Sequence, residues 1–283
     1  IRALQYNECQ SAILAGVYAM LVPSVSQLYA AGGLTSRRGR SHTFDSRADG
    51  FGRGEACGCA LLGAERSRRA VDLASTAVRQ DGKSASLTAP NGQAQEALLR
   101  AARLGAGVAL VLLEAHGTGT ALGDPVEAGA FAGVSSGAIQ LAPLCVGGTK
   151  ANIGHSEPAA GMVGVLKLVT GLEKAHSAPN AQLRALNPHL MNRADSVACM
   201  LPAVHLAGLS RVEREVVAGG ASSFGLGGTI AHTVISVGGA EEALVFGHGV
   251  DGSEALAFGL KTEPPGSKPS EAIAYLGRAP EVS

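Results

Sequence analysis

The sequence lacks the charge imbalance and the long apolar run that are typical of nucleic-acid-binding and membrane proteins. Its 283 residues carry 23 Lys and Arg against 23 Asp and Glu, so the formal net charge is zero. A basic footprint for nucleic acid is absent, and we interpret the cluster SRRGR at 36–40 as solvated loop charge. No uncharged apolar run reaches the length of about 18 residues that a membrane helix needs. We therefore predict no nucleic-acid partner and no membrane span.

Cysteine is scarce, and its spacing argues against a disulfide framework. The chain has five cysteines, none in a CxxC pair, and an odd number leaves at least one unpaired. Cys57 and Cys59 alternate with small residues in a strand-like run, so we interpret them as buried small hydrophobic residues in a reducing compartment. We predict no metal site. The five are Cys9, Cys57, Cys59, Cys145 and Cys199.

The start of the chain carries no targeting signal. It reads IRALQYNECQ, with neither an initiator methionine nor a signal peptide, and it resembles the inside of a domain. We therefore expect a fragment whose N-terminal half is incomplete. Cytoplasmic localisation is only the default expectation, because an organelle address would lie in the missing part.

Apolar runs punctuated by glycine predict alternating strands and helices over residues 1–236. A hydrophobic fraction of 46% is enough for a real core. The alternation predicts a layered α/β fold. After this region Gly, Glu, Pro and Ser dominate, so 237–283 is predicted to be a tail or linker, partly ordered at best. Buried strands are predicted at 9–17, 55–63 and 71–78, further strands at 107–115, 144–150, 216–228 and 229–237, and helices at 24–33, 94–105, 123–134 and 158–176.

Three of the predicted helices carry specific signals. The helix 94–105 should bury one face and end at Gly105. Asp124 is a plausible N-cap for the helix that follows it, with Pro125 in its first turn. The helix 158–176 is rich in small residues and should pack very close to a neighbour. The predicted buried face of 94–105 consists of Ala97, Leu98, Ala101 and Leu104.

Three stretches share one form, an apolar strand followed by a glycine-rich turn with polar groups. They are VLLEAHGTGT, CVGGTKANIGHSEPAAG and ASSFGLGG. Strand ends that lead into sharp turns are where α/β proteins place their sites, and glycine lets backbone N–H groups approach a ligand. A histidine after a strand is more often structural, and neither GTGT nor GLGG fits a phosphate-binding or dinucleotide-binding motif. Two histidines, a lysine and a donor-rich turn together indicate a carbonyl-activating site.

EAHGTGTALGDPVEA, TKANIGHSEPAAG and SSFGLGGTIAH resemble the three C-terminal signature segments of the β-ketoacyl synthases, particularly ketosynthase domains of modular or type I polyketide synthases. FDSRADGFGRGEACG at 44–58 and QDGKSASLTAPNGQAQEALLR at 80–100 resemble that family's intervening segments, in order and spacing. The resemblance covers about residues 1–236, the predicted ketosynthase region. It implies the thiolase-like αβαβα layered fold.

The resemblance also implies an acyltransferase of polyketide or fatty acid biosynthesis. In such enzymes a cysteine accepts the acyl chain from the phosphopantetheine of an acyl carrier protein. A malonyl unit on a second carrier loses CO₂, and the resulting enolate attacks the thioester in a decarboxylative Claisen condensation that gives a 3-oxoacyl product. The implied partner is thus an acyl carrier protein. The full-length protein would be a homodimer, and the chain would bind no cofactor of its own.

Site residues follow from the resemblance, position by position. His116 and His155 would hydrogen-bond the malonyl thioester oxygen through neutral imidazole N–H groups as it becomes an enolate. Lys150 would orient this site and pair with Glu127 or Glu157, because a buried lysine needs a partner. The implied catalytic residues are His116, His155 and Lys150; the substrate-binding residues are Thr118 and Thr120 at the phosphopantetheine arm and Phe224, Gly225, Leu226 and Gly227 in the gating and oxyanion turn; the supporting residues are Glu127, Glu157 and Asn152.

The main departure from the family pattern is the nucleophile. A segment resembling DTACSSS should precede NECQSAILAGV, and it is absent. Leu226 also replaces the usual gating phenylalanine, and Ile230 replaces an asparagine. Two alternatives therefore stay open beside condensation: a non-catalytic partner like the chain-length factors, or a decarboxylase without a condensation step. The remaining six histidines, including His189 and His232, are predicted to be structural or exposed.

Overall fold

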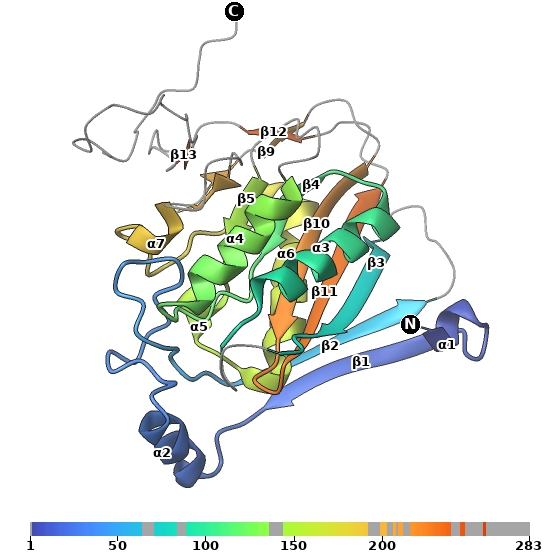
Figure 1. Cartoon of the computed structure of the whole chain (residues 1–283). Helices are drawn as coiled ribbons and strands as arrows, with labels where there is room; N and C mark the ends of the chain where they lie inside the picture. The colour runs from blue at the N-terminus through green and yellow to red at the C-terminus, as the bar shows by residue number, and fades with distance from the viewer. Residues whose placement is uncertain are drawn as a thin grey trace, which may run out of the picture.

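A mixed seven-stranded sheet forms the centre of the computed structural model, which describes residues 2–63, 71–83, 89–135, 144–191, 199–202, 206–207, 209–211, 216–238, 244–246 and 257–258 (Figure 1). The strand order is β13-β7-β5-β4-β10-β11-β3. The strands β7, β5, β4 and β10 run parallel, and β13, β11 and β3 pair antiparallel with their neighbours. The sheet consists of β3 (Val71–Gln80), β4 (Leu110–Glu114), β5 (Leu144–Gly147), β7 (Cys199–Met200), β10 (Val216–Phe224), β11 (Thr229–Gly238) and β13 (Ala257–Phe258).

Helices cover both faces of this sheet. On one face α3 (Gly92–Ala106) packs against β3 and β11, beside α4 (Gly123–Ser135). On the other face α6 (Ala160–Lys174) packs against β4 and β10. Beyond α6 lies a two-stranded ribbon of β1 (Ser11–Tyr18) and β2 (Ala56–Gly63). The layers are therefore helix, sheet, helix, sheet, in agreement with the predicted α/β layering.

The shorter elements complete the chain. They are α1 (Arg2–Gln5), α2 (Pro23–Ala31), α5 (Lys150–Ile153), the 3₁₀ turn η1 (Glu157–Ala159), β6 (His176–Ser177), α7 (Pro188–Met191), β8 (Leu206–Ala207), β9 (Leu209–Arg211) and β12 (Leu244–Phe246). Within the predicted tail 237–283, β12 pairs with β9 and β13 pairs with β7, and most of the other residues of that range lie outside the described part. No helix in the described ranges has the length and apolarity that a bilayer-spanning helix requires.

The predicted helices exist, but their caps and faces differ in detail. The side chain of Asn91 caps the N-terminus of α3, and Gly107 ends the helix with a φ of 65°, two residues beyond the predicted Gly105. Of the predicted buried face, Leu98 is buried and Ala97 and Ala101 are half-buried, but Leu104 was predicted wrongly, because it is 83% exposed. Asp124 is not an N-cap, since it lies inside the first turn of α4. The residues of α3 that are buried are Gln95, Leu98, Leu99 and Ala102.

Close packing of the helix 158–176 is confirmed for its main part, α6. A Cβ built on Gly161 would lie 3.1 Å from Ser223 Oγ of β10, and one built on Gly164 would lie 3.2 Å from Glu114 Cγ of β4. These contacts leave no room for a larger side chain without displacement. The small residues of α6 therefore bring the helix directly onto the two strands that lead into the predicted site.

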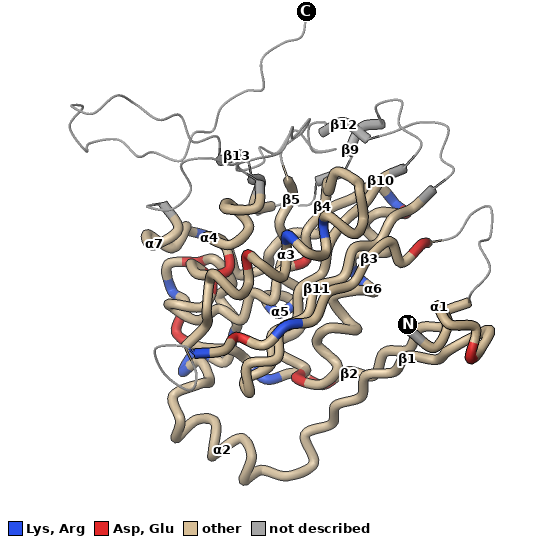
Figure 2. Tube along the Cα trace, turned by 45° about the vertical axis from the view of Figure 1, so that its right-hand side comes forward, with Lys and Arg blue, Asp and Glu red and all other residues tan. Residues whose placement is uncertain are grey.

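The ribbon of β1 and β2 corrects the prediction of buried strands at 9–17 and 55–63. Both strands form, yet only Gly16 and Gly58 are buried, where the ribbon touches η1 and α6. Cys57 and Cys59 are exposed rather than buried. Figure 2 shows that neither strand carries a charged residue. Apolar composition predicted the strands correctly, but burial also requires a covering layer, and none of the described elements covers the outer face. The third strand, β3, is a half-buried to exposed sheet edge.

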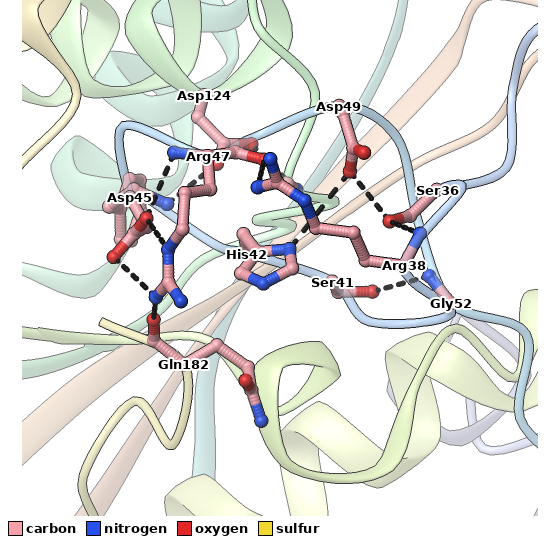
Figure 3. A network of polar contacts seen from close by, with 12 residues as sticks. Ser36, Arg38, Ser41, His42, Asp45, Arg47, Asp49, Gly52, Asp124 and Gln182 are labelled. Carbon is pink, nitrogen blue, oxygen red and sulfur yellow. Dashed lines mark hydrogen bonds and ion pairs between the residues drawn. The ribbon is translucent and has the colours of Figure 1, made fainter. Parts of the chain in front are cut away.

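A long loop between α2 and β2 wraps against the turns that follow β4 and α5, and Figure 3 shows its polar contacts. Its centre is Asp45, which is fully buried. The carboxylate accepts hydrogen bonds from the Arg47 guanidinium at 2.7 Å and from the backbone N–H groups of Arg184 at 2.7 Å and Ala185 at 3.1 Å. Burial alone would raise the pKa of Asp45, but these hydrogen bonds together hold it well below its ordinary value.

We predict that Asp45→Asn lowers the free energy of unfolding by about 3 kcal/mol at pH 7, because the amide group faces donors that need an acceptor. A depressed folded-state pKa stabilises the fold above the unfolded pKa of about 4, and that stabilisation is lost as the pH falls. The deficit of the variant should therefore shrink below about pH 4. Urea denaturation at several pH values measures this, with the more exposed Asp49→Asn as the control. An equal effect for the two variants at pH 7 would contradict the prediction.

Candidate active site

His116 lies just beyond the end of β4, and its backbone is held by a buried carboxylate. Glu127 of α4 accepts the N–H of His116 at 2.7 Å and the N–H of Gly117 at 2.8 Å. Gly117 and Gly119 have positive φ angles of 46° and 76°, which glycine adopts without steric cost. The glycines of the GTGT motif therefore turn the chain sharply, and the strand end and α4 together fix the position of the imidazole.

His155 reaches the same region from a different turn. It follows α5 and Gly154, whose φ is 81°. The N–H of His155 donates to Gly52 O at 2.6 Å, and the N–H of Gly54 donates to His155 O at 3.0 Å. The loop between α2 and β2 thus holds this histidine by its backbone on both sides.

The two imidazoles converge, as predicted. Their ring centroids lie 5.6 Å apart in an edge-to-face arrangement. Both rings line one cavity of about 530 Å³. The described residues that line it with them are Tyr29, Leu34, Phe51, Asp81, Ala89, Pro90, Gln95, Thr118, Thr120, Gly123, Glu127, Glu157, Pro158, Ser223, Phe224, Gly225 and Leu226. The strand and helix order therefore brings together segments that are up to 197 residues apart, from Tyr29 to Leu226.

Backbone hydrogen bonds fix the tautomer of each ring. The N–H of Phe224 donates to His116 Nδ1 at 3.2 Å, and the N–H of Glu157 donates to His155 Nδ1 at 3.0 Å. A nitrogen that accepts a hydrogen bond carries no proton, so in the neutral ring the proton lies on Nε2. Both histidines therefore have Nε2–H as their donor.

The surroundings keep both rings neutral. Burial lowers the pKa of His116 well below its ordinary value, and the positive charge of Lys150 lowers it further. Burial, again with the charge of Lys150, lowers the pKa of His155 to about 3. At neutral pH the site therefore presents two uncharged N–H donors rather than imidazolium ions.

Lys150 lies behind the histidines rather than in the cavity wall. Its Nζ donates to His116 O at 2.5 Å. Burial lowers the pKa of Lys150, and the negative charges of Glu114, Glu127 and Asp124 counter that effect. Of the two candidate partners of Lys150, Glu127 contributes its negative charge, whereas Glu157 was wrong, because its carboxylate binds Arg53 and two tyrosines instead.

Two buried acids lie beneath the turn that carries His116. Asp124 accepts the N–H groups of Phe44 at 2.7 Å and Gly119 at 3.0 Å. Burial raises the pKa of Asp124 to about 6 and that of Glu127 to about 7, despite the backbone hydrogen bonds that each accepts. These carboxylates hold the turn by accepting backbone N–H groups, and Glu127 also forms part of the cavity lining.

The predicted arm-binding and turn residues lie at the cavity, with one exception. Thr118 and Thr120 both line it, with their hydroxyl oxygens 3.3 Å apart. Phe224, Gly225 and Leu226 line it from the turn between β10 and β11. Gly227 does not belong to the lining, and its carbonyl accepts a hydrogen bond from Gln80. Asn152 is exposed outside the cavity and donates to Pro179 O at 3.2 Å, as a loop-supporting residue would.

Sequence reasoning missed Glu114 and Lys167, a pair that joins the two histidine turns. Lys167 of α6 donates to Glu114 at 2.7 Å, and Glu114 also accepts the backbone N–H of Thr149. Glu114 lies two residues before His116, and Thr149 immediately precedes Lys150. The sequence did contain a signal for this pair: Glu114 ends an otherwise apolar strand, and a buried charge needs a partner.

None of the described cysteines lies at this cavity. Cys145 is buried on β5, and its thiol donates to Ser177 Oγ at 3.0 Å. Burial raises the pKa of Cys145 to about 11, which disfavours the thiolate. It lines a separate cavity of about 620 Å³ between the sheet and α6. Cys145 is therefore present but does not have the setting of a nucleophile at the two histidines. No group of three potential metal ligands occurs in the described ranges.

Comparison with known proteins decides the family. The profile of the beta-ketoacyl synthase N-terminal domain matches residues 1–67, and that of the C-terminal domain matches residues 70–184. The chain belongs to the β-ketoacyl synthase family. It is 38% identical over 247 residues to a phenolphthiocerol/phthiocerol polyketide synthase of Mycobacterium tuberculosis, and 34% identical over 244 residues to the highly reducing polyketide synthase VdtX of Byssochlamys spectabilis.

Solved ketosynthases have the same fold. The ketosynthase from module 6 of the bacillaene synthase of Bacillus subtilis 168 matches with a TM-score of 0.78 and 29% identity over 83% of the chain. An oxazolomycin ketosynthase domain of Streptomyces albus JA3453 matches with a TM-score of 0.77 and 31% identity over 84% of the chain. The thiolase-like layered fold is thereby confirmed. The chain spans 44% of each of these two ketosynthase chains, and 84% of it matches 13% of the mycobacterial synthase.

We predict that native alkylation distinguishes the cysteines. Cys57 and Cys59 are exposed and should react with iodoacetamide at pH 8, whereas Cys145 should stay unmodified because its buried thiol has a raised pKa. Peptide mapping by mass spectrometry measures the modified fraction, and a sample unfolded in guanidinium is the control in which Cys145 reacts as well. Modification of native Cys145 at a rate near that of Cys57 would contradict this account.

Proposed function

We propose that the cavity at His116 and His155 decarboxylates a malonyl thioester and supplies the enolate for a Claisen condensation in polyketide biosynthesis. The observation that carries the proposal is the convergence of two neutral Nε2–H donors on one cavity, with ring centroids 5.6 Å apart. Membership of the β-ketoacyl synthase family supports the same reaction.

The chemistry requires donors rather than a base. When the bond between the malonyl carboxyl carbon and its neighbour breaks, CO₂ leaves and the electron pair moves onto the thioester oxygen. Two preorganised N–H groups stabilise the negative charge that develops there. An imidazolium would instead pair with the malonyl carboxylate before reaction and stabilise the starting state. Because their pKa values are lowered, both histidines stay neutral and stabilise the transition state more than the bound substrate.

The remaining cavity residues suit the other parts of the reaction. Thr118 and Thr120 offer hydroxyls to the amide groups of a phosphopantetheine arm, so an acyl carrier protein is the proposed partner. The N–H of Leu226 makes no hydrogen bond within the described part of the chain and lies in the turn that lines the cavity. We assign this N–H to the oxygen of the acyl thioester that the enolate carbon attacks.

The thioester itself must come from a cysteine outside the described lining. Cys145 does not serve, for the reasons of burial and raised pKa given above. Carbon–carbon bond formation releases that cysteine as a thiolate and leaves a 3-oxoacyl thioester two carbons longer on the carrier. A homodimer of the full-length protein and a cytoplasmic location remain predictions.

The decisive experiment follows CO₂ release from malonyl-pantetheine, the arm without its carrier. We expect His116→Ala and His155→Ala each to lower the rate by about 10²–10³-fold, the usual effect of removing one such donor. His189→Ala is the matched control, because this histidine lies exposed on α7. Rates within threefold of wild type for both cavity variants would rule out decarboxylation at this site.

A further inference from the structure

Glu157 has an unusual backbone conformation beside the cavity. Its φ is 44°, in the left-handed region that non-glycine residues rarely adopt. Pro158 follows it, and a proline disfavours the right-handed helical region for the residue before it. In this conformation the backbone N–H of Glu157 donates a hydrogen bond to His155 Nδ1 at 3.0 Å. A strained residue therefore supplies the bond that sets the tautomer of a site histidine.

The side chain of Glu157 is anchored on three sides. Tyr18 OH of β1 donates to it at 2.8 Å, Tyr29 OH of α2 at 3.2 Å and Arg53 at 3.2 Å. The Arg53 guanidinium also lies over both tyrosine rings, 5.6 Å and 5.2 Å from their centroids. The side chains of Arg53 and Glu157 are 8% and 17% exposed. Three donors from three segments of the chain thus hold one carboxylate in a fixed place.

The backbone around this cluster is tied to the same histidine. Arg53 forms a parallel β-bridge with His155, and the residues on both sides of Arg53 exchange backbone hydrogen bonds with His155. A rotation of the Glu157 backbone would move its carboxylate away from these donors, unless His155 moved with it and broke its bridge to Arg53. The anchored side chain therefore offsets the cost of the left-handed backbone conformation of Glu157.

We propose that Glu157 is a positioning residue, whose side chain, anchored by Tyr18, Tyr29 and Arg53, holds its backbone N–H on His155 Nδ1 and so keeps the Nε2–H of His155 aimed into the cavity. The inference rests on the proposed function. It gives Glu157 a role other than the pairing with Lys150 for which it was one of two candidates. It also gives Tyr18 of β1 and Tyr29 of α2 a part in the site.

Three substitutions at one position test the proposal. Glu157→Ala removes the anchor, so we expect its kcat for malonyl-pantetheine decarboxylation to fall by about 10–100-fold with little change in KM, because the misaimed donor acts in the transition state. Glu157→Gln keeps an acceptor and should stay within about threefold of wild type. Glu157→Gly adopts positive φ without strain. Its decrease in log kcat should therefore be about half that of the alanine variant, or smaller.

A second measurement is independent of activity. The nitrogen chemical shifts of labelled His155 report which ring nitrogen carries the proton. We expect Nε2–H in the wild type and in Glu157→Gln, and a substantial Nδ1–H population in Glu157→Ala. Tyr18→Phe, which removes one donor without touching the cavity lining, should shift the tautomer population in the same direction, and it serves as the test variant should the alanine variant not fold. Tyr6→Phe is the control, since Tyr6 is 69% exposed.

The outcomes separate the positioning role from the proposed function. If His155→Ala abolishes decarboxylation while Glu157→Ala keeps both the wild-type kcat and the Nε2–H tautomer, the positioning role is wrong and the function stands. If His155→Ala has no effect on decarboxylation, the function fails, while the tautomer measurement still decides whether Glu157 orients the ring. An equal loss for Ala, Gly and Gln would also overturn the proposal, because the conformation of residue 157 would then have no part in the effect.

Discussion

Two backbone N–H groups, those of Phe224 and Glu157, donate to the Nδ1 atoms of His116 and His155, and the chemistry of the site depends on this pair of hydrogen bonds. A neutral imidazole has one donor and one acceptor nitrogen, and occupying the acceptor leaves the donor free for substrate. Burial keeps both rings uncharged. The same bonds would be lost with the other tautomer, so the protein selects one of two nearly equivalent forms of each ring.

The fold brings the two histidines and the N–H of Phe224 together because the elements that precede them end close to one another. β4 leads to His116, α5 leads to His155 and β10 leads to Phe224, while α6 packs through Gly161 and Gly164 against the strands that carry two of them. Buried charges then fix the turns. Glu127 holds the backbone at His116, and the Glu114–Lys167 pair connects the two histidine turns. These buried carboxylates thus position the backbone from which the two histidines project.

Local patterns in the sequence predicted the two histidines well, but they predicted poorly the residues that hold these histidines in place. A strand, a histidine and a glycine turn lie within ten residues of one another, so His116 and His155 could be recognised from short segments. The partners of Glu157 could not, because Tyr18 and Tyr29 lie more than 120 residues away in the sequence and no local signal connects them. Burial of β1 and β2 was mispredicted for a related reason: an apolar run indicates a strand, whereas burial depends on what packs over it.

The proposed reaction requires that His116 and His155 each carry a single ring proton, on Nε2. Nitrogen-15 spectra of the wild-type chain, with its eight histidines labelled and His116 and His155 assigned by substitution, report the charge and tautomer of each ring. At pH 7 we predict that both rings are neutral, with the proton on Nε2 and none on Nδ1. A ring that is doubly protonated at this pH, or one with its proton on Nδ1, would contradict the account, because that histidine could not then serve as the neutral Nε2 donor to the enolate oxygen.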